Sequence, residues 1–311
     1  MSDARCTQLR RPILIFGPTA GGKSALALAL AERLDGEVIN ADALQVYAGW
    51  RVLTARPTPA DEARAPHRLY GHVPVSAAHS TGHWLREAVP AIRAAQGAGR
   101  TPIVVGGSGL LFSALTEGLA EIPETPPQVR TETENFLQSQ GVEALSQALR
   151  ARDTATWSRL DPANPRRLSR AWEVLETTGK GLAAWQAETP APTVPLAAAR
   201  PLRLIPPTDL LEARIAARFD AMLAAGALDE ARRMAAAEAS AQSLQALGAA
   251  ELFAHLRGEI SLPEARARAI LATRRYAKRQ RTWARNRLAA WPLAADPDRA
   301  LALLASAPPS A

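Results

Sequence analysis

The stretch that decides the fold is residues 13–34, ILIFGPTAGGKSALALALAERL. Four apolar residues lead into a glycine-rich turn at 17–24, and a run of good helix formers follows. This order predicts a strand, a loop and a helix. GPTAGGKS also matches the complete P-loop pattern, in which backbone N–H groups and a helix N-terminus face a phosphate. A chance glycine-rich turn is disfavoured because both flanking elements are of the required type.

Two side chains of the P-loop carry chemistry of their own. Lys23 supplies a mobile positive charge for phosphate oxygens, and Ser24 offers a hydroxyl to Mg²⁺. The glycines let the backbone wrap closely around the anion. The loop therefore predicts a diphosphate- or triphosphate-binding site.

Further strands are expected at 37–40, 102–105 and 202–205, with helices at 84–95 and 110–119. Strand–helix alternation indicates an α/β fold, a P-loop NTPase-like parallel sheet flanked by helices. Between residues 121 and 201 the strand pattern stops, and proline-rich turns separate helical stretches. We expect four regions, which are the first part of the core (1–120), a helical insertion (121–201), core completion with basic C-terminal helices (202–290), and a loosely held tail (291–311).

Composition narrows the class of protein. The 311 residues include one cysteine, Cys6, which excludes a disulfide framework and a cysteine-based zinc site. The chain has no apolar run of signal-peptide or membrane-spanning length, so we expect a cytoplasmic protein without membrane association, and a monomer.

The positive charge is concentrated in one segment, RRYAKRQRTWARNR at 274–287, which holds seven basic and no acidic residues. The remainder of the chain is balanced at 30 basic and 30 acidic residues. At helical spacing one stripe carries Arg274, Lys278, Arg281 and Arg285, and the opposite side carries Tyr276, Gln280, Trp283 and Arg287. A solvated face with core aromatics is the alternative, but the lack of carboxylates favours contact with RNA. Arg166, Arg167 and Arg170 form a second, smaller basic group.

Two polar groups follow predicted strands. Asp42 comes after the strand at 37–40, and the turn 106–109, which includes Ser108, comes after the strand at 102–105. Ligands of an open parallel sheet bind at the carboxyl ends of strands, so both are expected beside the P-loop. Asp42 could act as a general base, hold Mg²⁺ through water, or cap a turn or helix. The turn could hold substrate or be a plain strand-to-helix turn with Ser108 as N-cap.

The histidines carry weaker signals. His79 and His83 have the spacing of a helical metal pair but no evident third ligand, and His67 and His72 belong to no motif. We expect surface or partly buried roles for them.

Six segments in this order resemble the tRNA dimethylallyltransferases, also called tRNA isopentenyltransferases. They are GPTAGGKS (17–24), INADALQVY (39–47), LTARPTPADEARAPHRLYGHV (53–73), IVVGGSGLLFSALTEGL (103–119), PRRLSRAWEVLETTGK (165–180) and YAKRQRTWAR (276–285). The resemblance runs from about residue 12 to 287. It implies transfer of a dimethylallyl group from dimethylallyl diphosphate to N6 of adenosine 37 in tRNA, beside the anticodon, with Mg²⁺.

The resemblance also implies site residues. The donor diphosphate would be held by Gly17, Pro18, Thr19, Ala20, Gly21, Gly22, Lys23 and Ser24, with Ser24 on Mg²⁺. Asp42 would be the general base, assisted by Thr19 and Lys23. The tRNA would contact Asp42, Ala43, Leu44, Gln45, Ser108, Arg130, Arg166, Arg167, Leu168, Ser169, Arg170, Gln245, Lys278, Arg279, Gln280, Arg281, Thr282, Trp283 and Arg285.

The chain departs from the family pattern at four positions. Ala43 and Gly21 stand where serine is common, Ser108 stands where threonine is usual, and Ala249 replaces the tyrosine of a Leu-Gly-Tyr motif. None removes a group that the chemistry needs, although Ala43 and Ala249 lose possible contacts. Three other functions are kept as alternatives, which are a small-molecule P-loop kinase, a prenyltransferase for free adenine nucleotides, and a non-catalytic RNA-binding protein.

Overall fold

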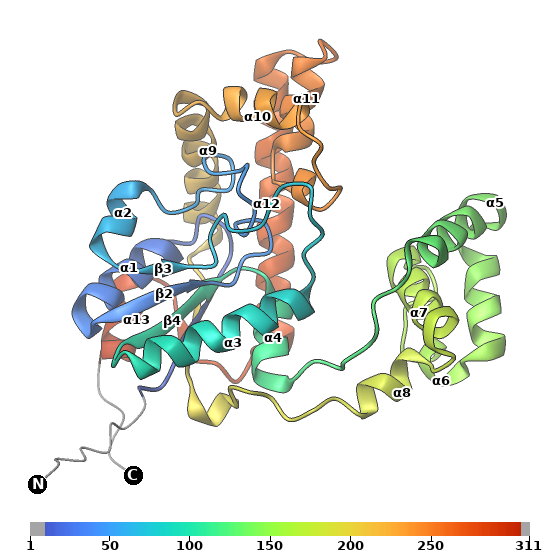
Figure 1. The fold of residues 1–311 in the computed structure, drawn as a ribbon. Coiled ribbons are helices and arrows are strands. Elements are labelled where there is room, and N and C mark those ends of the chain that lie inside the picture. Colours follow the sequence, from blue (N-terminus) through green and yellow to red (C-terminus); the bar gives the residue numbers. More distant parts are fainter. Residues whose placement is uncertain (1–9, 306–311) are drawn as a thin grey trace, which may run out of the picture. The chain divides into compact units, whose positions relative to one another are not determined.

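The computed structural model describes residues 10–305, and the chain divides into two compact units (Figure 1). The sheet unit contains the described residues up to Thr116 and from Thr193 onward. The helical unit, Glu117–Pro192, is inserted between them. Residues 193–201, expected in the insertion, belong to the sheet unit, because Val194 packs in its core and a strand begins at Arg200.

A six-stranded parallel sheet forms the centre of the sheet unit, in the order β3-β2-β4-β1-β5-β6. The strands are β1 (Ile13–Phe16), β2 (Gly36–Asn40), β3 (His67–Arg68), β4 (Thr101–Gly106), β5 (Arg200–Leu204) and β6 (Leu293–Ala294). The P-loop strand β1 lies between β4 and β5, with Phe16 opposite Gly106 and Arg203. The expected parallel α/β sheet is confirmed, with two short edge strands, β3 and β6, that the sequence did not indicate.

Helices cover both faces of this sheet. They are α1 (Lys23–Leu34), α2 (Pro59–Arg64), α3 (Thr81–Gly97), α4 (Gly109–Glu117), η1 (Leu196–Ala198), α9 (Thr208–Ala224), α10 (Ala227–Ala235), η2 (Ser243–Gln245), α11 (Ala249–Leu256), α12 (Leu262–Arg287) and α13 (Pro297–Ala305). Because strand side chains alternate, Leu14 and Phe16 join one hydrophobic core, with α3, α4, α9 and α12. Ile13 and Ile15 join the other, with α1 and α13.

The predicted loose tail needs correction over much of its length. Residues 293–294 pair with β5 as an edge strand, and α13 places Ala300 and Leu304 in the core beside α1. Their apolar side chains are buried on the sheet, which holds this segment in place. Residues 306–311 lie outside the described residues.

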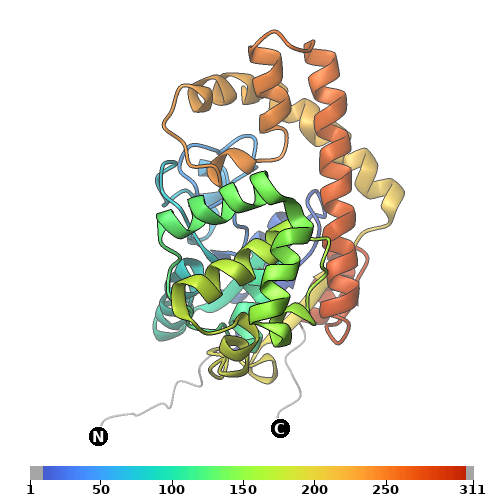
Figure 2. The same cartoon turned by 90° about the vertical axis from the view of Figure 1, so that its right-hand side faces the viewer.

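The helical stretch expected from residue 209 to 287 is several helices. Gly226 and Gly248, with φ of 93° and 91°, immediately precede α10 and α11. Only glycine adopts this left-handed conformation readily, so both mark reversals of the chain. The last helix, α12, runs without interruption for 26 residues and is drawn in orange in Figure 2.

The helical unit has its own small core. Its helices are α5 (Pro127–Arg152), α6 (Thr154–Trp157), α7 (Pro165–Thr178) and α8 (Leu182–Ala187), and residues 117–192 contain no strand. Leu145 and Leu149 of α5 pack against Leu168 and Leu175 of α7. Gly141, with φ of 83°, divides α5 into two helical segments.

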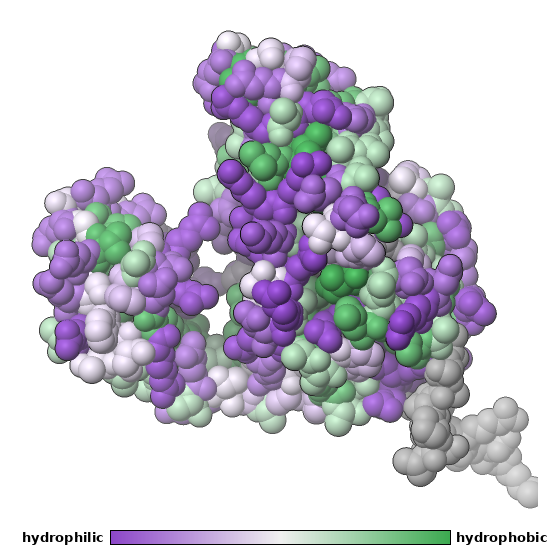
Figure 3. Space-filling view, turned by 180° about the vertical axis from the view of Figure 1, so that it is seen from behind, coloured by the Kyte–Doolittle hydropathy of each residue, from purple (hydrophilic) through white to green (hydrophobic). Residues whose placement is uncertain are grey.

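Within residues 10–305, no helix is both long enough and apolar enough to span a membrane. On the face shown in Figure 3, hydrophilic side chains are interspersed with smaller hydrophobic groups.

Candidate active site

The P-loop joins β1 to α1 at the carboxyl edge of the sheet. Gly22 caps α1 with φ of 90°, and the Lys23 Nζ donates a hydrogen bond to the Pro18 carbonyl at 2.6 Å. Gly17 has no room for a side chain, since a Cβ there would lie 2.4 Å from the Leu204 carbonyl oxygen. The loop is therefore a tight backbone turn at a helix N-terminus, as an anion site requires.

Asp42 is fixed at the end of β2 by a hydrogen-bonded chain. The Trp84 indole donates to the Asn40 carbonyl at 2.7 Å, and the Asn40 side chain accepts from the Asp42 amide at 2.9 Å. Asp42 Oδ1 accepts from the Leu44 amide at 3.0 Å, which is the local turn that the sequence kept as an alternative. In this turn, among the hydrogen bonds of the described residues, only one of the two Asp42 carboxylate oxygens, Oδ1, accepts a hydrogen bond.

Asp42 lies in a group of partly buried charges with Lys23 and Arg218. Burial lowers the pKa of Lys23 to about 8, an effect that the negative charge of Asp42 opposes and the positive charge of Arg218 reinforces. Burial likewise lowers the pKa of Arg218, and Asp42 opposes this shift. Sequence analysis did not identify Arg218, because a single arginine in the amphipathic α9 carries no motif.

A pocket opens beside this charged group. Its polar side is formed by Thr19, Asp42, Arg218 and Tyr276. Its apolar wall is formed by Leu44, Leu53, Ile215, Phe219, Met222 and Leu247. Burial and the charge of Asp42 together raise the pKa values of Tyr276 and Tyr70, so both phenols stay protonated. The pocket therefore combines one carboxylate, Asp42, and one cation, Arg218, with an apolar surface.

The turn after β4 lies against the turn after β2. Ser108 Oγ accepts a hydrogen bond from the Ala43 amide at 3.0 Å and is also hydrogen-bonded to the Tyr276 side chain. A Cβ at Gly106 would lie 1.9 Å from the Ala41 carbonyl oxygen, so only glycine permits this approach. The predicted placement of Ser108 beside Asp42 is supported by these contacts, and its hydroxyl organises the neighbouring turn.

Gln280 of α12 connects the P-loop to the same turn. Its Oε1 accepts from the Thr19 amide at 2.9 Å, and its Nε2 donates to the Gly107 carbonyl at 2.9 Å. The side chain is buried. A tRNA contact had been predicted for Gln280, but both ends of its amide are occupied inside the protein. Trp283 is also partly buried, with its ring packed against Phe16.

The residues present fit a magnesium ion. Ser24 lies exposed in the first turn of α1, directly after Lys23, where its hydroxyl can reach a metal held on a phosphate. Hydroxyl, carboxylate and phosphate oxygens are the hard ligands that Mg²⁺ prefers, and it keeps several of its waters.

The basic stripe of α12 lines a groove shared with the start of α9. Arg274, Lys278, Arg281 and Arg285 all line it, and the Arg274 guanidinium lies 3.5 Å from the Glu212 carboxylate. Lys278 and Arg285 are exposed. The four residues of the predicted stripe thus form one continuous wall of the groove, and Glu212 partly balances the charge of Arg274.

In the helical unit the predicted contact residues separate into two groups. Arg166 and Arg167 are exposed in the first turn of α7, and Arg170 bonds Thr125 Oγ1 at 2.8 Å. Leu168 is fully buried in the core of this unit, so its predicted tRNA contact is not compatible with the structure. Leu168 lies on the apolar side of α7, whereas the neighbouring Arg166 and Arg167 are exposed to solvent.

The remaining predicted residues vary in exposure. Arg130 is exposed, and its positive charge acts on the nearby Arg170. Gln45 donates from its side chain to the Thr54 and Ala55 carbonyls, which holds the loop beside the pocket. Side chains that reach solvent at least in part are those of Ala43, Leu44, Ser169, Gln245, Arg279 and Thr282.

The fold and the site combine a P-loop on a parallel sheet with a pocket that has a polar side and an apolar wall. Residues 45–287 match the IPP transferase family, and the chain belongs to this family. It is 57% identical over 94% of its length to the tRNA dimethylallyltransferase of Dinoroseobacter shibae, covering 97% of that protein. The corresponding enzyme of Cereibacter sphaeroides strain ATCC 17025 is 55% identical over 90% of the chain and 94% of its own length.

Solved structures agree with this assignment. A tRNA isopentenylpyrophosphate transferase from Bacillus halodurans is 33% identical, with a TM-score of 0.64 over 92% of this chain and 89% of that one. A eukaryotic dimethylallyltransferase acting on tRNA is 26% identical, with a TM-score of 0.75 over 88% of this chain and 70% of that one.

Proposed function

We propose that the protein transfers the dimethylallyl group of dimethylallyl diphosphate to N6 of adenosine 37 in tRNA, releasing diphosphate. One observation carries the proposal, which is the charged group of Asp42, Lys23 and Arg218, two of whose members, Asp42 and Arg218, line a pocket with an apolar wall. The relatives named tRNA dimethylallyltransferases support the choice of substrates.

The donor is held by its two ends. Its diphosphate lies in the P-loop, residues 17–24, and its hydrocarbon group lies against Leu53, Phe219 and Met222. As the allylic C–O bond breaks, negative charge grows on the leaving diphosphate. Lys23, Arg218 and the loop amides stabilise this charge in a buried place where electrostatic interactions are strong. When bound at Ser24, Mg²⁺ supplies further charge stabilisation to the diphosphate.

The acceptor is the exocyclic amine of an adenine taken out of its stack. Adenine N6 is a poor nucleophile, and Asp42 receives its proton as the new C–N bond forms. Anticodon-loop bases are single-stranded, so moving one into the pocket costs little. Tyr276 and Tyr70 stay neutral beside Asp42, so neither competes as a base.

The exposed basic residues would hold the tRNA. On the sheet unit these are Lys278, Arg279 and Arg285, together with the partly exposed Arg281, and Gln245 and Thr282 are polar neighbours. On the helical unit they are Arg130, Arg166, Arg167 and Arg170, with Ser169. Ala43, Leu44, Gln45 and Ser108 lie around Asp42 and would surround the adenosine.

The test is incubation with labelled dimethylallyl diphosphate and unmodified tRNA, followed by nucleoside analysis. We expect label in N6-(dimethylallyl)adenosine with tRNA, and none with adenosine monophosphate as acceptor. Label on the free nucleotide instead, or phosphoryl transfer from ATP to a small molecule, would overturn the proposal.

A further inference from the structure

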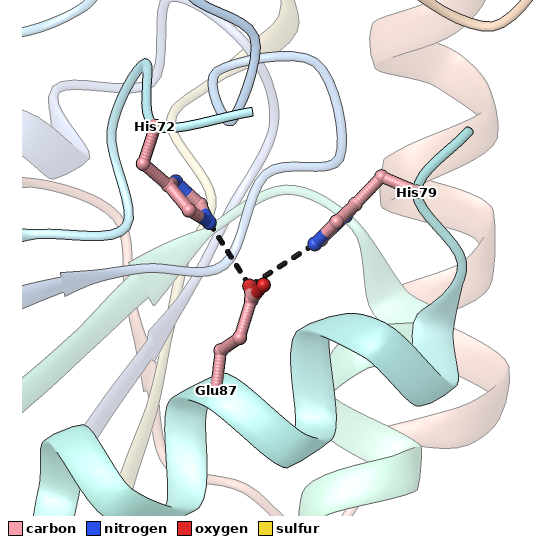
Figure 4. A group of neighbouring side chains, drawn as sticks. All are labelled: His72, His79 and Glu87. Carbon is pink, nitrogen blue, oxygen red and sulfur yellow. Dashed lines mark hydrogen bonds and ion pairs between the residues drawn. The ribbon is translucent and has the colours of Figure 1, made fainter. Parts of the chain in front are cut away.

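Three ligand-type side chains converge outside the donor pocket (Figure 4). The Glu87 Oε2 lies 2.9 Å from His72 Nε2 and 3.0 Å from His79 Nε2. The His79 side chain is only 6% exposed, whereas His72 and Glu87 are about one-third exposed. None of the three lines the pocket around Asp42.

The backbone around these side chains is held firmly. Gly71 and Val73, on either side of His72, donate hydrogen bonds to the Gln45 and Val46 carbonyls, both at 2.9 Å. The His79 amide donates to Gln242 Oε1 at 2.9 Å. Glu87 projects from the second turn of α3. The arrangement is therefore set by long-range contacts and does not depend on the three side chains alone.

His79 and His83 have the spacing of a helical metal pair in the sequence, but surface or partly buried roles were expected for them. His79 precedes Ser80, the N-cap of α3, so the two are not on one helical face. His83 Nδ1 accepts a hydrogen bond from the Ser80 amide, as part of the helix cap. The side chains that lie close to His79 Nε2 are instead those of Glu87 and of His72, seven residues before His79.

We propose that His72, His79 and Glu87 bind a divalent transition-metal ion, for which Zn²⁺ is the best match. Two imidazole nitrogens and one carboxylate oxygen are ligands that zinc accepts, with water in the fourth position. Zinc bonds of about 2.1 Å in tetrahedral geometry place ligand atoms about 3.4 Å apart. The two Glu87–imidazole distances would lengthen by only about 0.4–0.5 Å to reach this geometry, and the two imidazole nitrogens lie within 4.8 Å of each other.

The ion would cross-link the loop 71–79 to α3. Glu87 is one helical turn from Trp84, whose indole bonds to Asn40, the residue that holds the Asp42 backbone. The bound metal would thus stabilise the scaffold behind the active site without touching substrate.

The test uses the full chain, freed of metal by chelation and kept in excess Mg²⁺. Zn²⁺ binding is measured by calorimetry and by metal content after gel filtration. We expect one Zn²⁺ per chain for the wild type and for the control His255→Gln. Glu87→Gln and His79→Asn should each weaken binding by at least about 100-fold, because each removes a ligand.

Two further readouts keep the proposal open to refutation. Co²⁺ should give the visible absorption of a tetrahedral site in the wild type and not in Glu87→Gln. Glu87→Gln preserves the shape of the side chain, so this comparison remains possible if His79→Asn folds poorly. Zn²⁺ should also raise the melting temperature of the wild type and leave that of Glu87→Gln unchanged. Absence of Zn²⁺ binding by the wild type, or equal affinity in Glu87→Gln, would overturn the proposal.

Discussion

Replacing Lys23 by methionine is expected to stabilise the donor-free protein while abolishing transfer. Burial lowers the pKa of Lys23 from 10.5 to about 8. At about 1.4 kcal/mol per pH unit, keeping this lysine charged at pH 7 costs roughly 3 kcal/mol of folding free energy. Methionine removes this cost but loses the hydrogen bond to Pro18, which contributes about 1 kcal/mol. The free energy of unfolding should therefore rise by about 2 kcal/mol.

The effect has a defined pH dependence. Between pH 8 and 10.5 the unfolded wild type binds more protons than the folded protein, so wild-type stability rises with pH in this window. Lys23→Met lacks this rise. Its advantage should be complete below pH 8 and should disappear by about pH 10.5.

Urea unfolding at several pH values measures the effect, with the exposed Lys278→Met as a matched control that should change stability by less than about 0.5 kcal/mol. Dimethylallyl diphosphate should stabilise the wild type and not the Lys23 variant. A Lys23→Met protein that is less stable than the wild type at pH 7, with a parallel pH profile, would refute the reasoning.

Three other outcomes are expected. Asp42→Asn should lower the rate of transfer about 10²- to 10⁴-fold while tRNA affinity in a filter-binding assay changes less than about threefold; a normal rate at saturating tRNA would exclude Asp42 as the base. Gln280→Ala leaves the Thr19 amide and the Gly107 carbonyl without their partner, so it should lower the free energy of unfolding by about 1–3 kcal/mol and raise the KM for the donor. Unchanged values would show that this connection between the two loops is dispensable. Replacing Lys278 and Arg281 by glutamine should reduce the slope of log tRNA affinity against log salt concentration by about one to two units. Replacing two exposed arginines of α3 should leave this slope unchanged. Equal slopes for the wild type and the Lys278 and Arg281 double variant would mean that the stripe is only a solvated face.

Features that depend on residues close together in the chain could be predicted from the amino-acid sequence. The P-loop is contiguous, so strand, glycine turn and helix could be inferred from residues 13–34 alone. Strands buried on both faces show as uninterrupted apolar runs, which is why β1 and the centre of β4 were predicted. Asp42 could be placed at the site because the ends of parallel strands share one edge of the sheet. The four charges on α12 followed from helical periodicity.

Features that depend on residues far apart in the chain could not be predicted in this way, because they arise from packing between distant segments. In the sequence nothing distinguishes Arg218 from a solvent-exposed arginine on a helix. Only the packing of α9 brings Arg218 close to Asp42. Gln280 was predicted to contact tRNA, yet its side chain lies against loops more than 170 residues away in the chain, because the side of α12 that carries Gln280, Ala277 and Ala284 is buried. Leu168 is flanked by arginines but is buried because the apolar stripe of α7 passes through it. Glu87 likewise meets His72 and His79 only because a loop is held over α3.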